Sequence, residues 1–213
     1  MVTHLSNRVA PRPPRPRGGE LLRTPFVILA AVLVILGAGI WATALGGDDA
    51  ATDAAACNAS PEAEAAGLSP QKANALDDVE PATLDKTRIR VLNANGESGQ
   101  AGAIAAQLSE RGFRAAGQNA TGNDPVYPGQ DLGCHGQIRY GDKGAGTARS
   151  LSLVAPCMEL VSDPRSDDTV DLVLGKIFSK LSDSTRAYSA LDELKAGRQP
   201  SDADLEAARA GNC

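Results

Sequence analysis

The stretch that decides the fold is residues 89–112, which read IRVLNANGESGQAGAIAAQLSERG. Its opening residues 89–92 are mostly apolar and β-branched, a composition typical of a buried strand. Residues 93–99 are rich in asparagine and glycine, which predicts a turn. Small and apolar residues then recur at helical spacing and stop at a glycine, so we expect a helix that ends at Gly112; these residues are Ala101, Ile104, Ala105 and Leu108.

The chain beyond this unit continues to alternate between strand and helix patterns. Residues 113–118 predict a strand, and a loop rich in glycine and proline follows over residues 122–136. A helix is expected to carry Ala148, Leu151 and Ala155 and to stop at Pro156. Further strands are expected at residues 137–140, 158–161 and 169–174. The prediction is therefore an α/β domain over residues 88–175, a compact βαββαββ sheet with packed helices.

Helical extensions are expected on both sides of this domain. In the N-terminal extension, residues 57–87, Ser60-Pro61 and Ser69-Pro70 each resemble a helix N-cap followed by proline. The C-terminal extension, residues 176–213, has helical patterns and a predicted N-cap at Ser201 for a helix over residues 202–210. Its apolar positions with helical spacing are Ile177, Phe178, Leu181, Tyr188, Leu191 and Leu194.

The N-terminal part of the chain predicts one transmembrane helix. Residues 26–45 form an uncharged run of about twenty residues, long enough to cross a bilayer. The preceding tail, residues 1–25, holds five arginines and places the N-terminus in the cytoplasm, and residues 46–56 form a linker of small residues. Two alternatives are weaker: Ala42 to Ala44 fits a signal-peptidase site and Ala54 to Cys57 resembles a lipobox.

Length and charge exclude several classes of protein. The 213 residues carry a formal net charge of -5 and 3% aromatic residues, which argues against a large multidomain enzyme and against a basic nucleic-acid-binding protein. Because the tail is positive, the rest of the chain is more acidic than this total. We therefore expect a membrane-anchored protein with an acidic extracytoplasmic domain and no nucleic-acid partner.

The four cysteines all follow the predicted anchor, and their even number predicts two disulfides in an oxidising compartment. Three pairings are possible. We favour Cys134–Cys157, which flank a strand–helix–strand unit, and Cys57–Cys213, which would join the ends of the domain. No C-x-x-C pair is present, so no metal site or cofactor is expected.

The turn at residues 93–99 is the strongest candidate for ligand binding. Backbone amides at a helix N-terminus can hold an anion, but the glycine spacing matches neither a dinucleotide fingerprint nor a P-loop, and Glu97 would repel a phosphate. The alternative is a purely structural connection. A serine–histidine hydrolase would need Ser98 and His135, and a noncatalytic His135 is much the better interpretation. The predicted ligand-contact residues are Asn93, Asn95, Gly96, Ser98 and Gly99.

The core resembles the LytR C-terminal domain family. The resemblance is carried by strand 89–93, the glycine-containing turn, the alanine-rich helix that ends at Phe113, strand 137–140 and the late strand 170–175. It implies a non-catalytic extracytoplasmic module that helps to maintain the cell envelope. The implied partners are an envelope lipid, a cell-wall glycopolymer or an envelope-assembly protein. An envelope hydrolase or transferase and a purely architectural subunit of a membrane complex are the alternatives.

Overall fold

The computed structural model describes residues 28–29 and 56–209. The predicted cytoplasmic tail lies outside the described residues, and so do the linker up to residue 55 and all of the predicted membrane helix except Ile28 and Leu29, which are helical. Among the residues that are described, no helix has both the length and the apolar character needed to span a bilayer.

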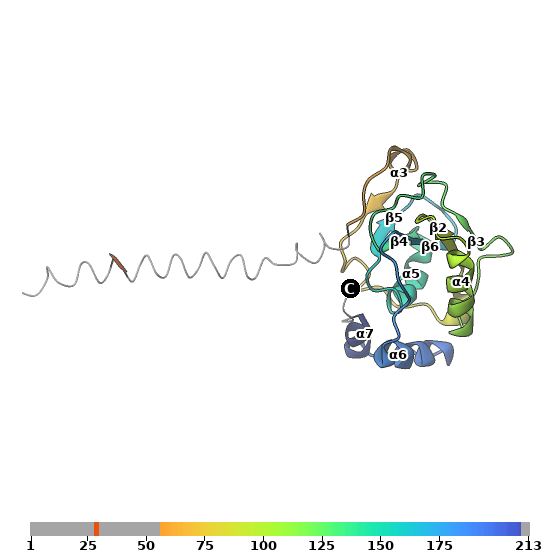
Figure 1. Cartoon of the computed structure of the whole chain (residues 1–213). Coiled ribbons are helices and arrows are strands. Elements are labelled where there is room, and N and C mark those ends of the chain that lie inside the picture. The colour runs from red at the N-terminus through yellow and green to blue at the C-terminus, as the bar shows by residue number, and fades with distance from the viewer. Residues whose placement is uncertain (1–27, 30–55, 210–213) are drawn as a thin grey trace, which may run out of the picture. The chain divides into compact units, whose positions relative to one another are not determined.

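The described domain contains a six-stranded mixed sheet (Figure 1). The strand order across the sheet is β1, β5, β4, β6, β2 and β3. Strand β2 is parallel to both of its neighbours, and β4 is antiparallel to β6 but parallel to β5. The strands are β1 (Ser69–Pro70), β2 (Ile89–Asn93), β3 (Thr121–Asn123), β4 (Gly136–Tyr140), β5 (Glu159–Ser162) and β6 (Val170–Leu174).

Helices connect these strands and extend the chain beyond them. Helix α4 joins β2 to β3, and α5 joins β4 to β5. Helix α3 lies at the opposite end of the domain from α6 and α7, which pack against each other (Figure 1). The helices are α3 (Pro61–Ala65), α4 (Gln100–Glu110), α5 (Ala145–Ser152), α6 (Thr185–Lys195) and α7 (Asp202–Arg209), with 3-10 turns at η1 (Leu84–Lys86) and η2 (Asp142–Gly144).

The central strands are buried on both faces because different parts of the chain cover each face. Val91 and Leu172 belong to the large apolar core that also contains the buried residues of α4 to α7. Their neighbours Leu92 and Val173 point to the other face, where they pack with Tyr127, Leu132 and Cys134 of the loop before β4. This two-sided burial explains the continuous apolar runs in the sequence.

The expected order βαββαββ is confirmed within residues 88–175, but one strand lies elsewhere. Residues 113–118 do not form a strand; they make a single bridge from Ala115 to Ile89, and Gly117 then turns the chain with φ of 84°. The chain then pairs with β2 as strand β3, which begins at Thr121 and overlaps the start of the segment expected to be a loop, residues 122–136. A positive φ interrupts an extended strand, and the sequence pattern alone did not reveal it.

The extensions are less helical than expected. Ser60 does cap α3 by accepting a hydrogen bond from the Ala63 amide at 3.0 Å, and Ser201 accepts one from the Asp204 amide at 3.3 Å. Residues 69–70, in contrast, are not a helix start; they form β1 beside β5. Residues 176–178 are not helical either, because the amides of residues 176 and 177 donate to the carbonyls of Leu132 and Cys134.

The favoured disulfide pairing is wrong, because Cys57 is bonded to Cys134, with 5.0 Å between their Cα atoms. The starts of β4 and β5 do lie at the same edge of the sheet. The N-terminal segment crosses that edge, and this places Cys57 next to Cys134. Asn58 holds this segment in place: its Oδ1 accepts from the Gly133 amide at 2.6 Å and its carbonyl accepts from the Tyr127 hydroxyl at 2.6 Å. Cys157 is also disulfide-bonded.

Candidate functional site

The turn between β2 and α4 is shaped by the side chain of Asn93. Its Nδ2 donates to the Glu97 carbonyl at 2.9 Å, and its Oδ1 accepts from the Asn95 amide at 3.2 Å. Helix α4 follows Gly99, whose φ of 79° is in the left-handed region that favours glycine. Asn93 is buried, so its amide group serves the turn and is not presented to solvent.

Asn95 is also used within the fold. Its Nδ2 donates to Gln100 Oε1 at 2.7 Å and to the Gly175 carbonyl at 3.1 Å, while its Oδ1 accepts from the Glu97 amide at 2.9 Å. These bonds connect the turn to the first residue of α4 and to the end of β6. Asn95 therefore fixes where α4 begins, and its side-chain amide has little capacity left for a ligand.

A hollow of about 510 Å³ lies beside the turn, at the carboxyl ends of the parallel strands β2 and β3. Four of the five predicted contact residues line this hollow: Asn93, Gly96, Ser98 and Gly99. Asn95, the fifth, does not. The remaining lining comes from the start of α4, from β3 and from Gln130, whose Oε1 accepts from the Gly96 amide at 3.2 Å.

The chemistry of this hollow is polar and uncharged. Its lining contains no lysine, arginine, aspartate or glutamate. Ser98 is exposed, and its hydroxyl makes no hydrogen bond to any described residue. Hydroxyls and amides of this kind suit a ligand rich in hydroxyl groups better than a phosphate, which would need positive charge.

The structure does not pair Ser98 with His135. His135 lines a different cavity, of about 280 Å³, between the start of β5 and the chain after β6. Apolar side chains, among them Met158, Phe178 and Leu181, form part of that cavity's wall, and no residue lines both hollows. The His135 Nδ1 atom is buried and has no hydrogen-bond partner among the described residues. The geometry therefore does not place Ser98 beside this histidine; the serines that line the cavity of His135 are Ser179, Ser182 and Ser184.

Buried charges on the sheet serve the fold. Arg139 makes two 2.9 Å bonds to the carboxylate of Asp124, and both side chains are almost completely buried. Arg139 also donates to Gln137, which in turn donates to Glu159 at 2.7 Å, and Glu159 accepts from the Cys57 amide. The three charged side chains of this network, Arg139, Asp124 and Glu159, all have hydrogen-bonding partners, as burial requires. The network connects the disulfide-bonded N-terminal segment to the sheet.

A second ionic cluster lies on the same face of the sheet, where Arg165 contacts both Asp163 and Asp171, and Asp171 is the cross-strand neighbour of Arg139. Burial raises the pKa of Asp163, but the hydrogen bonds from Arg165 outweigh it and hold this pKa below its usual value. Asp171 is bonded as well to Arg90 at 2.6 Å. The acidic run at residues 163–171 therefore includes a structural cluster, and among the described residues no group of His, Cys, Asp or Glu side chains could hold a metal ion.

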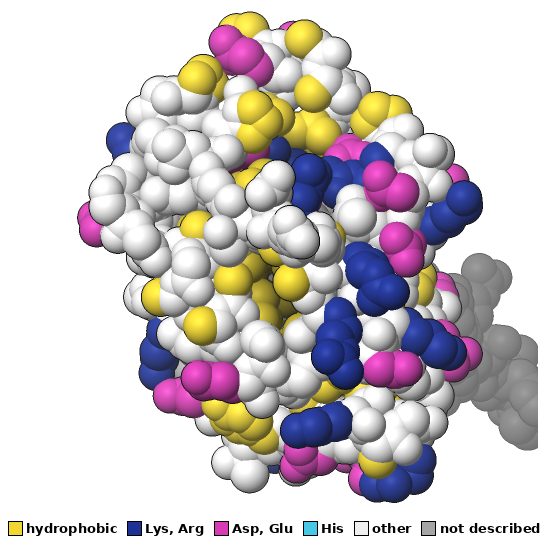
Figure 2. Space-filling view, turned by 90° about the vertical axis from the view of Figure 1, so that its right-hand side faces the viewer, with side chains coloured by type: hydrophobic (Ala, Val, Ile, Leu, Met, Phe, Trp, Pro, Cys, Tyr) yellow, Lys and Arg dark blue, Asp and Glu magenta, His cyan; other side chains and the backbone are white. Residues whose placement is uncertain are grey.

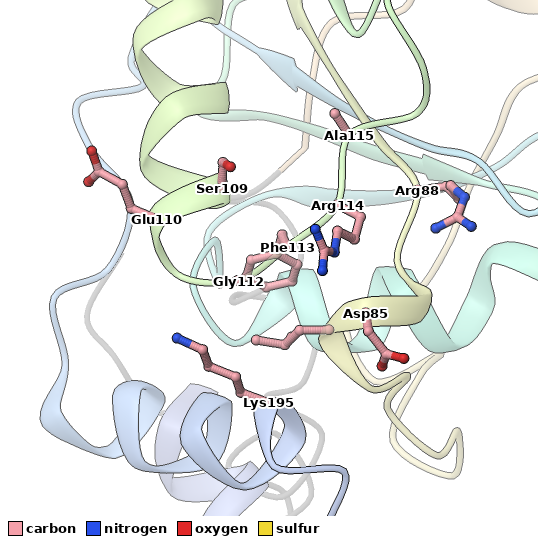
Figure 3. A pocket seen from close by; sticks show the side chains of 10 residues that line it. Asp85, Arg88, Ser109, Glu110, Gly112, Phe113, Arg114, Ala115 and Lys195 are labelled. Atoms are coloured by element: carbon pink, nitrogen blue, oxygen red, sulfur yellow. The ribbon is translucent and has the colours of Figure 1, made fainter.

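Sequence reasoning missed a larger hollow of about 880 Å³ at the opposite end of β2 from the turn. Arg88, Arg114 and Lys195 contribute to its lining (Figure 3). Lysine and arginine side chains also gather on one side of the face shown in Figure 2, although the net charge of the chain is negative. The three cations are far apart in the sequence, so no local motif could have indicated them.

Comparisons with known proteins agree with the fold. The sequence profile of the LytR cell envelope-related transcriptional attenuator domain matches residues 86–178. The chain is 40% identical over 188 residues to the cell envelope integrity protein Cei of Mycobacterium tuberculosis, and the match covers 85% of each protein. A crystal structure of the soluble domain of a conserved hypothetical secreted protein from Mycobacterium marinum has a TM-score of 0.63 and 40% identity, covering 68% of this chain and 97% of that one.

Proposed function

Because the chain belongs to the LytR C-terminal domain family, together with the envelope integrity protein Cei, we propose that it is a non-catalytic, membrane-anchored protein that maintains cell-envelope integrity. The observation that carries this proposal is the 40% identity to Cei across 85% of both chains. An identity at this level over most of both proteins supports a shared role in the cell envelope.

The proposed location is the outer side of the cell membrane, with one N-terminal membrane helix at residues 26–45 and the N-terminus in the cytoplasm. The apolar run and the arginines before it support this topology. The Cys57–Cys134 disulfide supports it independently, because disulfides persist in oxidising compartments outside the cytoplasm.

We propose that the domain acts by binding an envelope component, which is a lipid, a wall glycopolymer or an envelope-assembly protein. The uncharged, polar hollow beside the turn favours a hydroxyl-rich glycopolymer among these. In this proposal Ser98, Gly96 and Gly99 contact the ligand. Asn93 and Asn95 shape the turn through their internal hydrogen bonds.

Neither alternative function gains support from a specific contact. A hydrolase that uses Ser98 and His135 would require these residues to share a site, and they line separate hollows. A purely architectural subunit would leave the apolar stripe of the C-terminal helices partly exposed. Most of this stripe is buried in the core of the domain itself, as Leu181, Leu191 and Leu194 are, but Ile177 and Tyr188 are 54% and 41% exposed.

The test is complementation in the host after deletion of the gene. Wild-type chain should restore the envelope barrier, measured as uptake of a membrane-impermeant dye, and Ser98→Ala should restore it only in part. His135→Ala should restore it fully, because no catalysis is proposed. Ser189→Ala, another exposed serine that lies on α6, is the matched control. Immunoblotting should show equal amounts of every variant.

Two results would count against the proposal in different ways. An unchanged barrier after the deletion would refute a role in envelope integrity. Full rescue by both Ser98→Ala and Asn95→Ala would keep the envelope role but exclude the turn as the ligand site. Native mass spectrometry of wild-type protein from its host membrane, before and after mild organic extraction, would show whether a lipid or polymer accompanies it.

A further inference from the structure

Two hollows adjoin each other beside the carboxyl ends of α4 and α6. The larger, of about 880 Å³, includes Arg88, Arg114 and Lys195 in its lining, and the smaller, of about 380 Å³, includes Arg111 and Tyr188. Glu110 and Lys195 line both. We call the combined surface the cationic groove. Figure 3 shows Arg114 between Lys195 and Arg88, so the positive groups are spread along the groove.

The cations of the groove have no ion-pair partners within the described part of the chain. Arg88 donates only to the Thr87 carbonyl, and Arg111 donates to the Ser182 carbonyl while its guanidinium lies 5.0 Å from the centre of the Tyr188 ring. The side chains of Arg114 and Lys195 have no polar partner there. Because guanidinium groups carry several donors in a planar fork, most of this donor capacity is open to a ligand.

The shape of the groove depends on Gly112, which ends α4 with φ of 105°. A Cβ atom at this position would lie 3.2 Å from Leu84 Cδ1 and 3.6 Å from Lys195 Cδ. The absent side chain therefore lets the stem of Lys195 lie close across the turn. Buried Phe113 and Leu84 contribute the apolar part of the lining, and Ser109 adds a hydroxyl.

Carboxylates also line the groove, and they restrict the kind of ligand. Asp85, Glu110 and Asp192 stand among the four cations, so a ligand that offers only negative charge would be repelled in part. The carboxylate of Glu110 points away from Arg88 and Arg114 in Figure 3. A sugar chain with acid groups can bind both the carboxylates and the cations of the groove, because its hydroxyls donate to carboxylates and its acid groups accept from cations.

Tyr188 adds a surface suited to sugars. Its side chain is 41% exposed, a large fraction for an aromatic residue, and Arg111 stacks on its ring. An exposed ring can pack against the C–H groups on a sugar face. A membrane surface fits less well, because the groove is concave and Tyr188 is the one exposed large apolar residue of the described domain that lines it.

We propose that the cationic groove binds an acidic glycan, a chain of sugars that carries carboxylate or phosphate groups. The inference rests on the proposed envelope function and adds a second site to it, at the other end of β2 from the turn. Acid groups would contact Arg88, Arg114 and Lys195 in succession, and a sugar ring would lie on Tyr188.

The experiment is isothermal titration of the full chain in neutral detergent with hexagalacturonate and with phosphorylated maltohexaose. Maltohexaose is the neutral control of equal length, and dihexanoyl phosphatidylglycerol is the lipid probe. At least one acidic glycan should bind about tenfold more tightly than maltohexaose, and added salt should weaken it because the contacts are exposed. The variant Arg114→Gln/Lys195→Gln should lose about tenfold in affinity, from two exposed charge contacts.

The matched control is Arg186→Gln, an exposed cation on α6 that lines neither hollow, and its affinity should be unchanged. Equal melting temperatures would show that the variants are folded. The proposal is overturned if neither acidic glycan binds, if maltohexaose binds as tightly, if the double variant binds as well as wild type, or if the lipid binds the same residues more tightly. None of these results bears on rescue by Ser98 variants, so the two proposals fail separately.

Discussion

Breaking the Cys57–Cys134 disulfide should destabilise the domain strongly. The bridge closes a loop with a sequence separation of 77 residues, so it restricts the unfolded chain much more than a short-range bridge would. In the chain-entropy account a loop of this length is worth about 4.5 kcal/mol. The double substitution Cys57→Ala/Cys134→Ala should therefore lower the free energy of unfolding by about 4 kcal/mol and the melting temperature by roughly 10–15 °C.

The native state moderates this loss. Hydrogen bonds of Asn58 and Ser60 join the N-terminal segment to the loop before β4, so we expect the segment to stay packed against this loop without the disulfide. If it frays, the native state regains some entropy and the loss becomes smaller. The Asn58→Ala variant keeps the disulfide but removes the Gly133 contact, and should cost only about 1 kcal/mol.

The assay is urea unfolding followed by far-ultraviolet circular dichroism, together with non-reducing peptide mapping of the wild-type chain. Mapping should yield a peptide that joins Cys57 to Cys134, and the remaining cysteines should form the Cys157–Cys213 link. A Cys134–Cys157 peptide would refute the pairing. A loss below about 1 kcal/mol in the double variant would refute the entropic reasoning.

Two further outcomes follow from local contacts. Gly136→Ala should lower the free energy of unfolding in urea by about 3 kcal/mol or more, because the new Cβ would overlap the Val173 carbonyl oxygen. Gly102→Ala in α4 meets no atom within 4 Å and should raise the free energy of unfolding by about 0.5–1 kcal/mol. Equal effects of the two substitutions would contradict the geometry. Because the pKa of Asp163 is lowered in the fold, its contribution to stability is present above the unfolded pKa of about 4 and is lost as the pH falls below it. Asp163→Asn should therefore flatten the loss of stability on acidification below about pH 4, and an unchanged acid limb would contradict this.

Some features could be predicted from sequence because neighbouring residues determine them. The apolar run at 89–92 and the helical spacing from Ala101 to Leu108 are local signals, and both elements formed where expected. Four of the five residues chosen in the turn line one hollow for the same reason, since they lie within a few residues of one another. Local patterns failed where a single backbone angle decided the result, as at Gly117.

The sequence by itself determined the strand and helix order of the core, the family resemblance and the expectation of an oxidising compartment, because each depends on short-range patterns or on composition. Only the tertiary structure decided that Cys57 reaches Cys134, that the amides of Asn93 and Asn95 are consumed within the turn, and that Arg88, Arg114 and Lys195 share one groove. The physical reason is common to all three. Each depends on which distant segments pack together, and packing energy is summed over the whole core and is not encoded at any one position.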